Sequence, residues 1–206
     1  AVTEFFHRAK SEGASLVYAF ATAAVRTAEN GAEFVSLVKE SCGLTVDVIS
    51  GGEEAEIGIL GALGNDDGGI IDAGGASTEV IVRKGGTVLY KKSVNIGVVR
   101  LKDMCGTDKK MLEESAKSAA KSYGKLPCDV PMYAIGGTAT TLAAVLLEMK
   151  EYDPSRITGT VITAEKMHFL SEKLTAMSAE EIAALPGVPA KRADVLGGGA
   201  VLYSVL

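Results

Sequence analysis

The most informative segment of the sequence is Ile70-Ile71-Asp72-Ala73-Gly74-Gly75-Ala76-Ser77-Thr78-Glu79. Its first three residues predict a buried strand that stops at the glycine pair. Alternating side chains predict two more strands, Thr78–Arg83 and Thr87–Ser93, joined by the hairpin signal Lys84-Gly85-Gly86. An acidic residue at a strand end, followed by glycines, hydroxyls and a second carboxylate, offers N–H groups to a phosphate and carboxylates to a hard cation such as Mg²⁺. A hairpin turn with two solvated carboxylates remains the alternative, because glycine pairs are common in turns.

Beyond the hairpin the pattern is helical apart from one more strand. We expect helices near Val98–Met104 and Asp108–Tyr123, a strand over Pro131–Ile135, a helix over Thr138–Met149, and helical pieces at about 163–177, 179–185 and 190–206.

Before this stretch, helices and strands alternate. We expect a helix over Val2–Lys10, a strand over Leu16–Phe20 buried on both faces, a helix from Asn30 to Gly43 with Phe34, Leu37 and Val38 inward, a strand over Val46–Ile49 and a helix over Glu53–Leu63. This alternation is typical of an α/β layer architecture. The polar turn Asn65–Gly69 is the best candidate for a boundary, so we expect two regions, 1–66 and 67–206.

Three further features could carry chemistry. Ala134–Thr141 contains a second strand, glycine turn and helix start, where an anion can approach unpaired N–H groups; alternatively, Thr138 simply caps the helix. In Ser50–Glu56 a strand end leads into a helix with glutamates in its first turn. Ordinary helix-start electrostatics explains them, and a general base for water is the alternative. Arg26 could grip a phosphate, although a lone arginine on a helix is more often a solvated surface residue.

Composition excludes several classes. The 206 residues are 47% hydrophobic with a net charge of -5, which excludes wholesale disorder and argues against a nucleic-acid groove. Three dispersed cysteines indicate reduced thiols in a cytoplasmic protein. The uncharged stretch Val130–Leu147 contains a proline and two glycines, so a buried strand and helix start explain it better than a membrane span. His7 and His168 lack ligands at zinc spacing, and P-loop and nucleophile-elbow motifs are absent.

Five collinear motifs resemble those of the exopolyphosphatase and guanosine pentaphosphate phosphatase family (Ppx/GppA). They are Ala21–Arg26, Ile49–Ala55, Ile71–Glu79, Ser93–Leu101 and Ala134–Leu142. The resemblance implies an α/β fold of the actin-like ATPase (sugar-kinase) superfamily, in which two ribonuclease-H-like lobes face a phosphate-binding cleft. It implies a metal-dependent hydrolase that releases orthophosphate from polyphosphate or from guanosine pentaphosphate.

The resemblance also implies roles for individual residues. Glu54 is similar to the catalytic base that activates water, and Asp72 and Glu79 to the carboxylates that hold Mg²⁺, or another divalent cation, or its bound waters. The phosphate-binding positions that it implies are Arg26, Gly74, Gly75, Ser77, Gly136, Gly137 and Thr138.

The chain departs from the family pattern in three places. Ala76 replaces a glycine of the first loop, and Glu56 stands where a basic residue is common. The family's opening phosphate-loop strand has no counterpart, so we expect residues 1–66 to be an incomplete first lobe and residues 67–206 a complete second lobe. Removing strands exposes a sheet edge, which makes a homodimer possible.

Two alternatives to the hydrolase stay open. One is a phosphotransferase of the same superfamily, and the other is an inactive phosphate-binding fragment. We expect a cytoplasmic protein without nucleic-acid or membrane partners, and the sequence does not choose between polyphosphate and guanosine pentaphosphate.

Overall fold

A four-stranded mixed sheet in the order β5-β4-β3-β6 positions both glycine-rich loops. β3 (Gly68–Ala73) and β4 (Thr78–Lys84) are antiparallel, as are β4 and β5 (Thr87–Val94). β6 (Met132–Ile135) runs parallel to β3, with Asp72 opposite Ile135 at the last step. The carboxyl ends of β3 and β6 therefore meet at one edge of the sheet, which is where α/β proteins of this kind bind ligands.

The computed structural model describes residues 1–206 and divides into two compact units, Ala1–Glu54 and Ala55–Leu206. The division falls inside helix α4 (Gly51–Leu63), whereas the sequence places the region boundary just after this helix. The assignment of 1–66 and 67–206 to two lobes stays a prediction.

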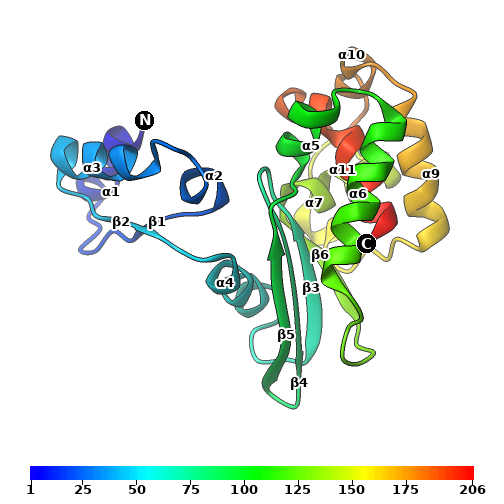
Figure 1. Ribbon diagram of the computed structural model, residues 1–206. Coiled ribbons are helices and arrows are strands. Elements are labelled where there is room, and N and C mark those ends of the chain that lie inside the picture. Colours follow the sequence, from blue (N-terminus) through cyan, green and yellow to red (C-terminus); the bar gives the residue numbers. More distant parts are fainter. The chain divides into compact units, whose positions relative to one another are not determined.

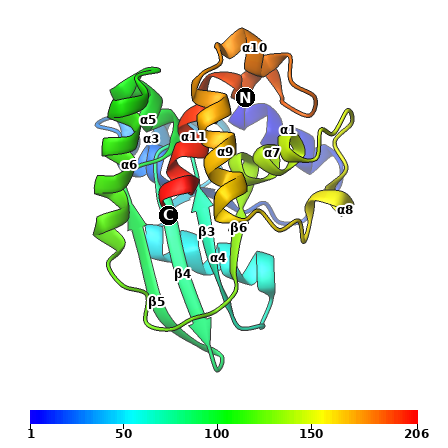
Figure 2. The same cartoon turned by 90° about the vertical axis from the view of Figure 1, so that its right-hand side faces the viewer.

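Helices cover both faces of the sheet in the second unit (Figures 1 and 2). Ala55 and Ile59 of α4 pack against Ile70 and Ile81 on one face. On the other face lie α6 (Lys109–Tyr123), α7 (Gly136–Leu146), α9 (Ala164–Thr175) and α11 (Ala193–Val205). The central α11 buries Leu196 and Leu202, because its sequence is apolar all round and neighbouring helices enclose it. The remaining elements are α5 (Val98–Cys105), α8 (Pro154–Ile157), α10 (Ala179–Ala183) and the 3₁₀ turn η1 (Ala190–Arg192).

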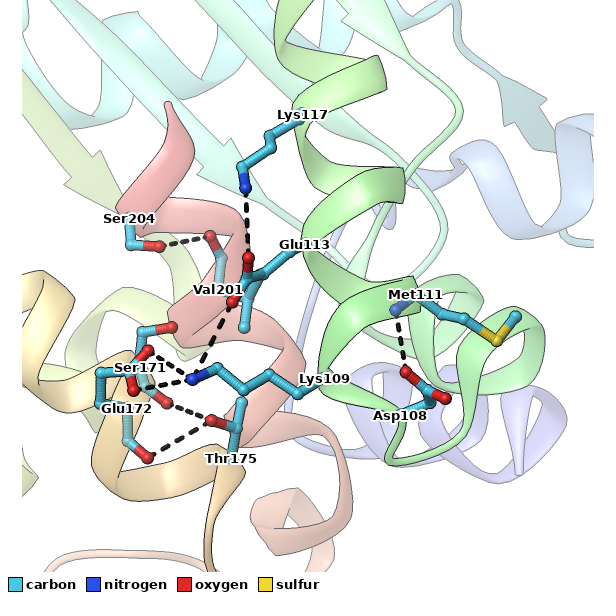
Figure 3. Close-up of polar contacts among 10 residues, drawn as sticks. All are labelled: Asp108, Lys109, Met111, Glu113, Lys117, Ser171, Glu172, Thr175, Val201 and Ser204. Carbon is cyan, nitrogen blue, oxygen red and sulfur yellow. Dashed lines mark hydrogen bonds and ion pairs between the residues drawn. The ribbon is translucent and has the colours of Figure 1, made fainter.

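Polar contacts cap the start of α6 and connect it to α9 (Figure 3). The Asp108 carboxylate caps α6 by accepting a hydrogen bond of 3.0 Å from the N–H of Met111. Lys109 Nζ then binds both carboxylate oxygens of Glu172 on α9, at 2.6 and 2.7 Å. Because both side chains are over 40% exposed, water screens this ion pair, and it orients α6 against α9 more than it stabilises the fold.

The β4–β5 hairpin confirms its sequence signal. Gly85 and Gly86 adopt φ of 61° and 72°, the left-handed region that a tight two-residue turn requires. The Asp67 carboxylate accepts hydrogen bonds from both of their N–H groups, at 2.6 and 3.1 Å. These two bonds lower the pKa of Asp67 and attach the hairpin to the start of β3.

The first unit contains α1 (Val2–Ser11), α2 (Ala23–Arg26), α3 (Gly31–Cys42) and two parallel strands, β1 (Ala19–Ala21) and β2 (Val46–Val48). The prediction of a doubly buried strand at Leu16–Phe20 was wrong, because Leu16, Tyr18 and Phe20 are all more than half exposed. Of the three side chains predicted to point inward on α3, only Val38 is buried. The helix ends as predicted at Gly43, with φ of 75°.

None of the helices is both long and apolar enough to cross a membrane.

Candidate phosphate-binding site

A pocket of about 370 Å³ lies where β3 and β6 end. The residues after β3 and the first turn of α7 form much of its wall, and the turn before α11 completes it. The lining residues are Asp72, Ala73, Gly74, Gly75, Val98, Val99, Gly137, Thr138, Lys191, Arg192, Val195 and Leu196. The structure thus brings together in one pocket five residues that the sequence predicted in two separate loops: Asp72, Gly74 and Gly75 at the end of β3, and Gly137 and Thr138 after β6.

The first loop is held from behind by the start of α5. The N–H groups of Val98 and Val99 donate to the carbonyls of Gly74 and Gly75, both at 2.9 Å, and Arg100 Nε donates to the Ala76 carbonyl at 3.0 Å. The N–H groups of Gly75, Ala76 and Ser77 have no backbone acceptor. The loop is therefore fixed through its carbonyls while three successive N–H groups stay available, which is the arrangement of an anion-binding nest.

Gly97 allows α5 to approach the loop this closely. A Cβ at this position would lie 2.5 Å from the Gly74 oxygen and 2.5 Å from both carbonyl atoms of Gly75. Those are backbone atoms, so no rotamer change could make room for it.

The carboxylate of Asp72 lies between the two loops. Asp72 lines the pocket, and Gly136 at the start of α7 approaches it so closely that a Cβ there would lie 2.5 Å from Asp72 Oδ1. Gly136 also has a φ of 82°, so both its conformation and its surroundings require glycine.

Glu79 occupies a different position from Asp72. Its side chain is 1% exposed and does not line the pocket. Glu79 Oε1 accepts hydrogen bonds from Ser77 Oγ at 2.7 Å and Ser93 Oγ at 2.6 Å. Hydroxyl donors of this kind offset the cost of burying a charge. The structure brings Ser77 and Glu79 together behind the loop, and the metal role of Glu79 stays a prediction.

The second loop opens α7, which begins at Gly136 rather than Thr138. Thr138 does not cap the helix, because Ile135 occupies the N-cap position and Thr138 Oγ1 donates to the Ala73 carbonyl at 3.1 Å. This bond ties the second loop to the first. The unpaired N–H groups and the positive end of the helix dipole at Gly136 and Gly137 favour a bound anion.

Arg192 and Lys191 are pocket residues that were not predicted from the sequence. The guanidinium of Arg192 lies against Gly137 and fills the space that a Cβ there would need. A signal was available, because a Lys-Arg pair directly before a helix opposes the helix dipole and is seldom placed there without a reason.

Arg26 and Glu54 lie together in the first unit. Arg26 Nη1 donates to the Ile49 carbonyl at 2.6 Å and lies 3.5 Å from Glu54 Oε2. Both side chains are slightly more than one-fifth exposed, so they remain accessible. The structure thus joins the predicted phosphate-binding arginine to the predicted base.

The two adjacent glutamates of α4 differ in their contacts. Glu53 Oε2 accepts from the Ser50 N–H at 2.7 Å while the Glu53 N–H donates to Ser50 Oγ at 3.2 Å, a reciprocal capping box. Capping of the helix start therefore explains Glu53. It does not explain Glu54, whose carboxylate contacts Arg26 instead. The unusual Glu56 forms an ion pair of 2.6 Å with Lys91 on β5, which explains an acidic residue there.

The pocket offers a divalent cation one carboxylate, that of Asp72, and no complete set of protein ligands. No three His, Cys, Asp or Glu side chains form a cluster that could hold a metal ion. Mg²⁺ commonly keeps several waters and takes only one or two carboxylates besides substrate phosphates. Asp72, on the pocket wall, fits that single-carboxylate mode.

Comparisons with known proteins find relatives along the whole chain. A family model described as the Ppx/GppA phosphatase family matches residues 1–206. Exopolyphosphatase 2 of Mycobacterium tuberculosis is 28% identical over 229 aligned positions, which cover 100% of this chain and 70% of the relative. The crystal structure of the Aquifex aeolicus Ppx/GppA family member is 29% identical with a TM-score of 0.80, covering 100% of this chain and 71% of that chain.

A further crystal structure, of an exopolyphosphatase-like protein, is 26% identical with a TM-score of 0.86 over 99% of this chain and 70% of that chain. These neighbours confirm the expected fold class, a mixed α/β architecture of the actin-like type.

Proposed function

The chain belongs to the Ppx/GppA phosphatase family, and we therefore propose that the protein releases orthophosphate from the terminal phosphoanhydride bond of inorganic polyphosphate or guanosine pentaphosphate. The observation that carries the proposal is the pocket shared by the two glycine-rich loops. Two sets of N–H donors and two cationic side chains around one cavity suit a ligand with several neighbouring negative charges.

We propose that the first loop and the start of α7 bind phosphate oxygens through the N–H groups of Gly75, Ala76, Ser77, Gly136 and Gly137. Donors fixed before the ligand arrives stabilise developing charge without reorganisation, and phosphoryl transfer relies almost entirely on such positioning and charge stabilisation. Lys191 and Arg192 add positive charge on the same wall.

Asp72 is the proposed ligand of a divalent cation such as Mg²⁺. When bound, such a cation supplies Lewis-acid stabilisation of charge on the phosphate oxygens. Asp72 is suited to this task because its carboxylate lies between the two loops.

Glu54 is the proposed general base, and Arg26 a proposed phosphate ligand. The Glu54 carboxylate accepts a proton from water as the water oxygen bonds to phosphorus and the bond to the bridging oxygen breaks. The products are orthophosphate and a chain shortened by one phosphate. The capping box of Glu53 supports the choice of Glu54, because it explains one glutamate as structural and not the other.

The test is orthophosphate release by the full-length protein from short polyphosphate, long polyphosphate, guanosine pentaphosphate and ATP, each with and without Mg²⁺. We expect release from the first three that depends on the cation. Glu54→Gln should abolish turnover, while Glu53→Gln, an identical change one residue earlier, should lower stability and keep turnover. Phosphate transfer from ATP to a small acceptor without release to water would contradict the proposal.

A further inference from the structure

Tyr203, near the end of α11, places its hydroxyl between the strands that carry the two phosphate-binding loops. The hydroxyl accepts a hydrogen bond from the Ala73 N–H at 3.3 Å. It lies 3.2 Å from the carbonyl oxygen of Ile135 and 3.4 Å from that of Ile71, so its single hydrogen has two acceptors, of which Ile135 is the nearer. Ala73 directly follows Asp72, and Ile135 directly precedes Gly136, so the hydroxyl touches both stems at the point where the loops leave the sheet.

The position of this hydroxyl follows the period of the parallel ladder. The Gly69 N–H donates to the Pro131 carbonyl on the β6 side of β3. Along a strand, the direction in which the backbone N–H points repeats every two residues. The Ala73 N–H, four residues after that of Gly69, therefore also points toward β6, opposite the Ile135 carbonyl. Tyr203 therefore bonds both the donor and the acceptor of the last step of the ladder.

The packing of α11 brings the hydroxyl to that step. Gly199 lies four residues earlier on the same helix face, and a Cβ there would come 2.5 Å from Thr138 Cγ2. The close approach at Gly199 lets α11 reach both loops. Burial of Tyr203 raises the pKa of its hydroxyl, which keeps the proton that it donates.

Ala73 consequently has both of its backbone polar groups bonded to side chains from helices. Its carbonyl accepts from Thr138 Oγ1 and its N–H donates to Tyr203. The residue between Asp72 and Gly74 is thus held from α7 and from α11 at once.

We propose that Tyr203 is a positioning residue that sets the spacing between the two phosphate-binding loops. The inference rests on the proposed function, because spacing matters only if one ligand bridges both loops. A ligand with two linked phosphates should depend on the hydroxyl, whereas a single phosphate, which one loop can hold, should not.

The test compares orthophosphate with methylenediphosphonate, a bridged analogue that is not hydrolysed, by calorimetry on the full-length protein and on Tyr203→Phe. This substitution removes only the hydroxyl and leaves the ring. We expect the Kd of methylenediphosphonate to rise about tenfold, equivalent to about 1.4 kcal/mol, while the Kd of orthophosphate stays within about twofold. The matched control is Tyr90→Phe on β5, which loses a hydroxyl bond to the Tyr123 carbonyl at the end of α6. Neither Tyr90 nor Tyr123 lines the pocket, so the Kd of orthophosphate and the Kd of methylenediphosphonate should both stay unchanged in the control.

A parallel change of both constants in Tyr203→Phe, or no change in either, would overturn the inference and leave the proposed function standing. Binding of neither anion by the wild-type protein, together with no orthophosphate release, would overturn the proposed function and the inference with it. Hydrogen exchange of the wild-type Ala73 amide provides a measurement independent of any variant. We expect exchange as slow as in the middle of β3, and exchange as fast as at Gly75 would also overturn the inference.

Discussion

Replacing Gly97 with alanine tests the role of α5 most directly. The backbone of Gly97 has φ of -136° and ψ of 175°, a conformation that alanine adopts without strain, so the cost of the change is steric alone. The new Cβ would lie 2.5 Å from the Gly74 oxygen and from the Gly75 carbonyl group. An ordinary contact begins near 3.4 Å, so α5 and the loop must separate by roughly 1 Å.

The consequences for stability and for activity should differ in size. Overpacking of this kind costs about 1–3 kcal/mol of unfolding free energy. A displacement of about 1 Å in a substrate-positioning loop can cost about 100-fold in rate, because its N–H groups no longer meet the phosphate oxygens. We therefore expect Gly97→Ala to lower kcat/KM for orthophosphate release about 100-fold while the protein remains folded.

Urea unfolding and initial-rate measurements on the full-length protein check both numbers. Gly61→Ala is the matched control, because a Cβ on this α4 residue would have no neighbour within 4 Å. The same substitution there should raise the unfolding free energy by up to about 1 kcal/mol, through helix propensity, and leave the kinetics unchanged. Wild-type kcat/KM in Gly97→Ala would show that close backbone contact with α5 does not fix the loop.

Three further variants test other contacts. Asp67→Asn should make stability depend less on pH in the acid range. The hairpin N–H groups depress the folded-state pKa of Asp67, so the stability that they provide is present above the ordinary pKa of about 3.9 and is lost as pH falls through the folded-state value. Identical acid unfolding of variant and wild type would contradict this. Glu79→Gln should lower the unfolding free energy by about 1–3 kcal/mol, because two serine hydroxyls lose a charged acceptor, and calorimetric melting would show it. Arg192→Ala should raise KM and reduce the salt dependence of binding more than Lys191→Ala, because only Arg192 contacts the start of α7; equal effects would count against that contact.

The strands and loops of the second unit were largely predictable because their signals are local. Alternation over Thr78–Arg83 and Thr87–Ser93, with a glycine turn between them, matches β4 and β5 to within a residue. The two glycine-rich turns were found for the same reason. What no local pattern indicates is that Ser77, in the loop before β4, and Ser93, on β5, both donate to Glu79.

Predictions that depended on burial failed where the tertiary environment decides. The apolar run Leu16–Phe20 has the composition of an inner strand, yet only Ala19 and Phe20 of that run enter the short β1, and the aromatic side chains remain exposed. The Lys-Arg pair before α11 marks Arg192 as unusual, but its contact with Gly137 joins residues far apart in the sequence, and only the fold reveals that partner.

The contact between Arg192 and the start of α7 also bears on how the protein behaves without substrate. A guanidinium placed at the positive end of a helix meets like charge, so without a bound anion the pocket holds two mutually repelling groups. A phosphate entering between them converts that repulsion into two attractions and stabilises the native form by mass action, by about 2.7 kcal/mol at a concentration of about 100 times its Kd. The Tm of the protein should therefore rise with the phosphate concentration of its buffer. Phosphate affinity and thermal stability would then both depend on Arg192 and the start of α7.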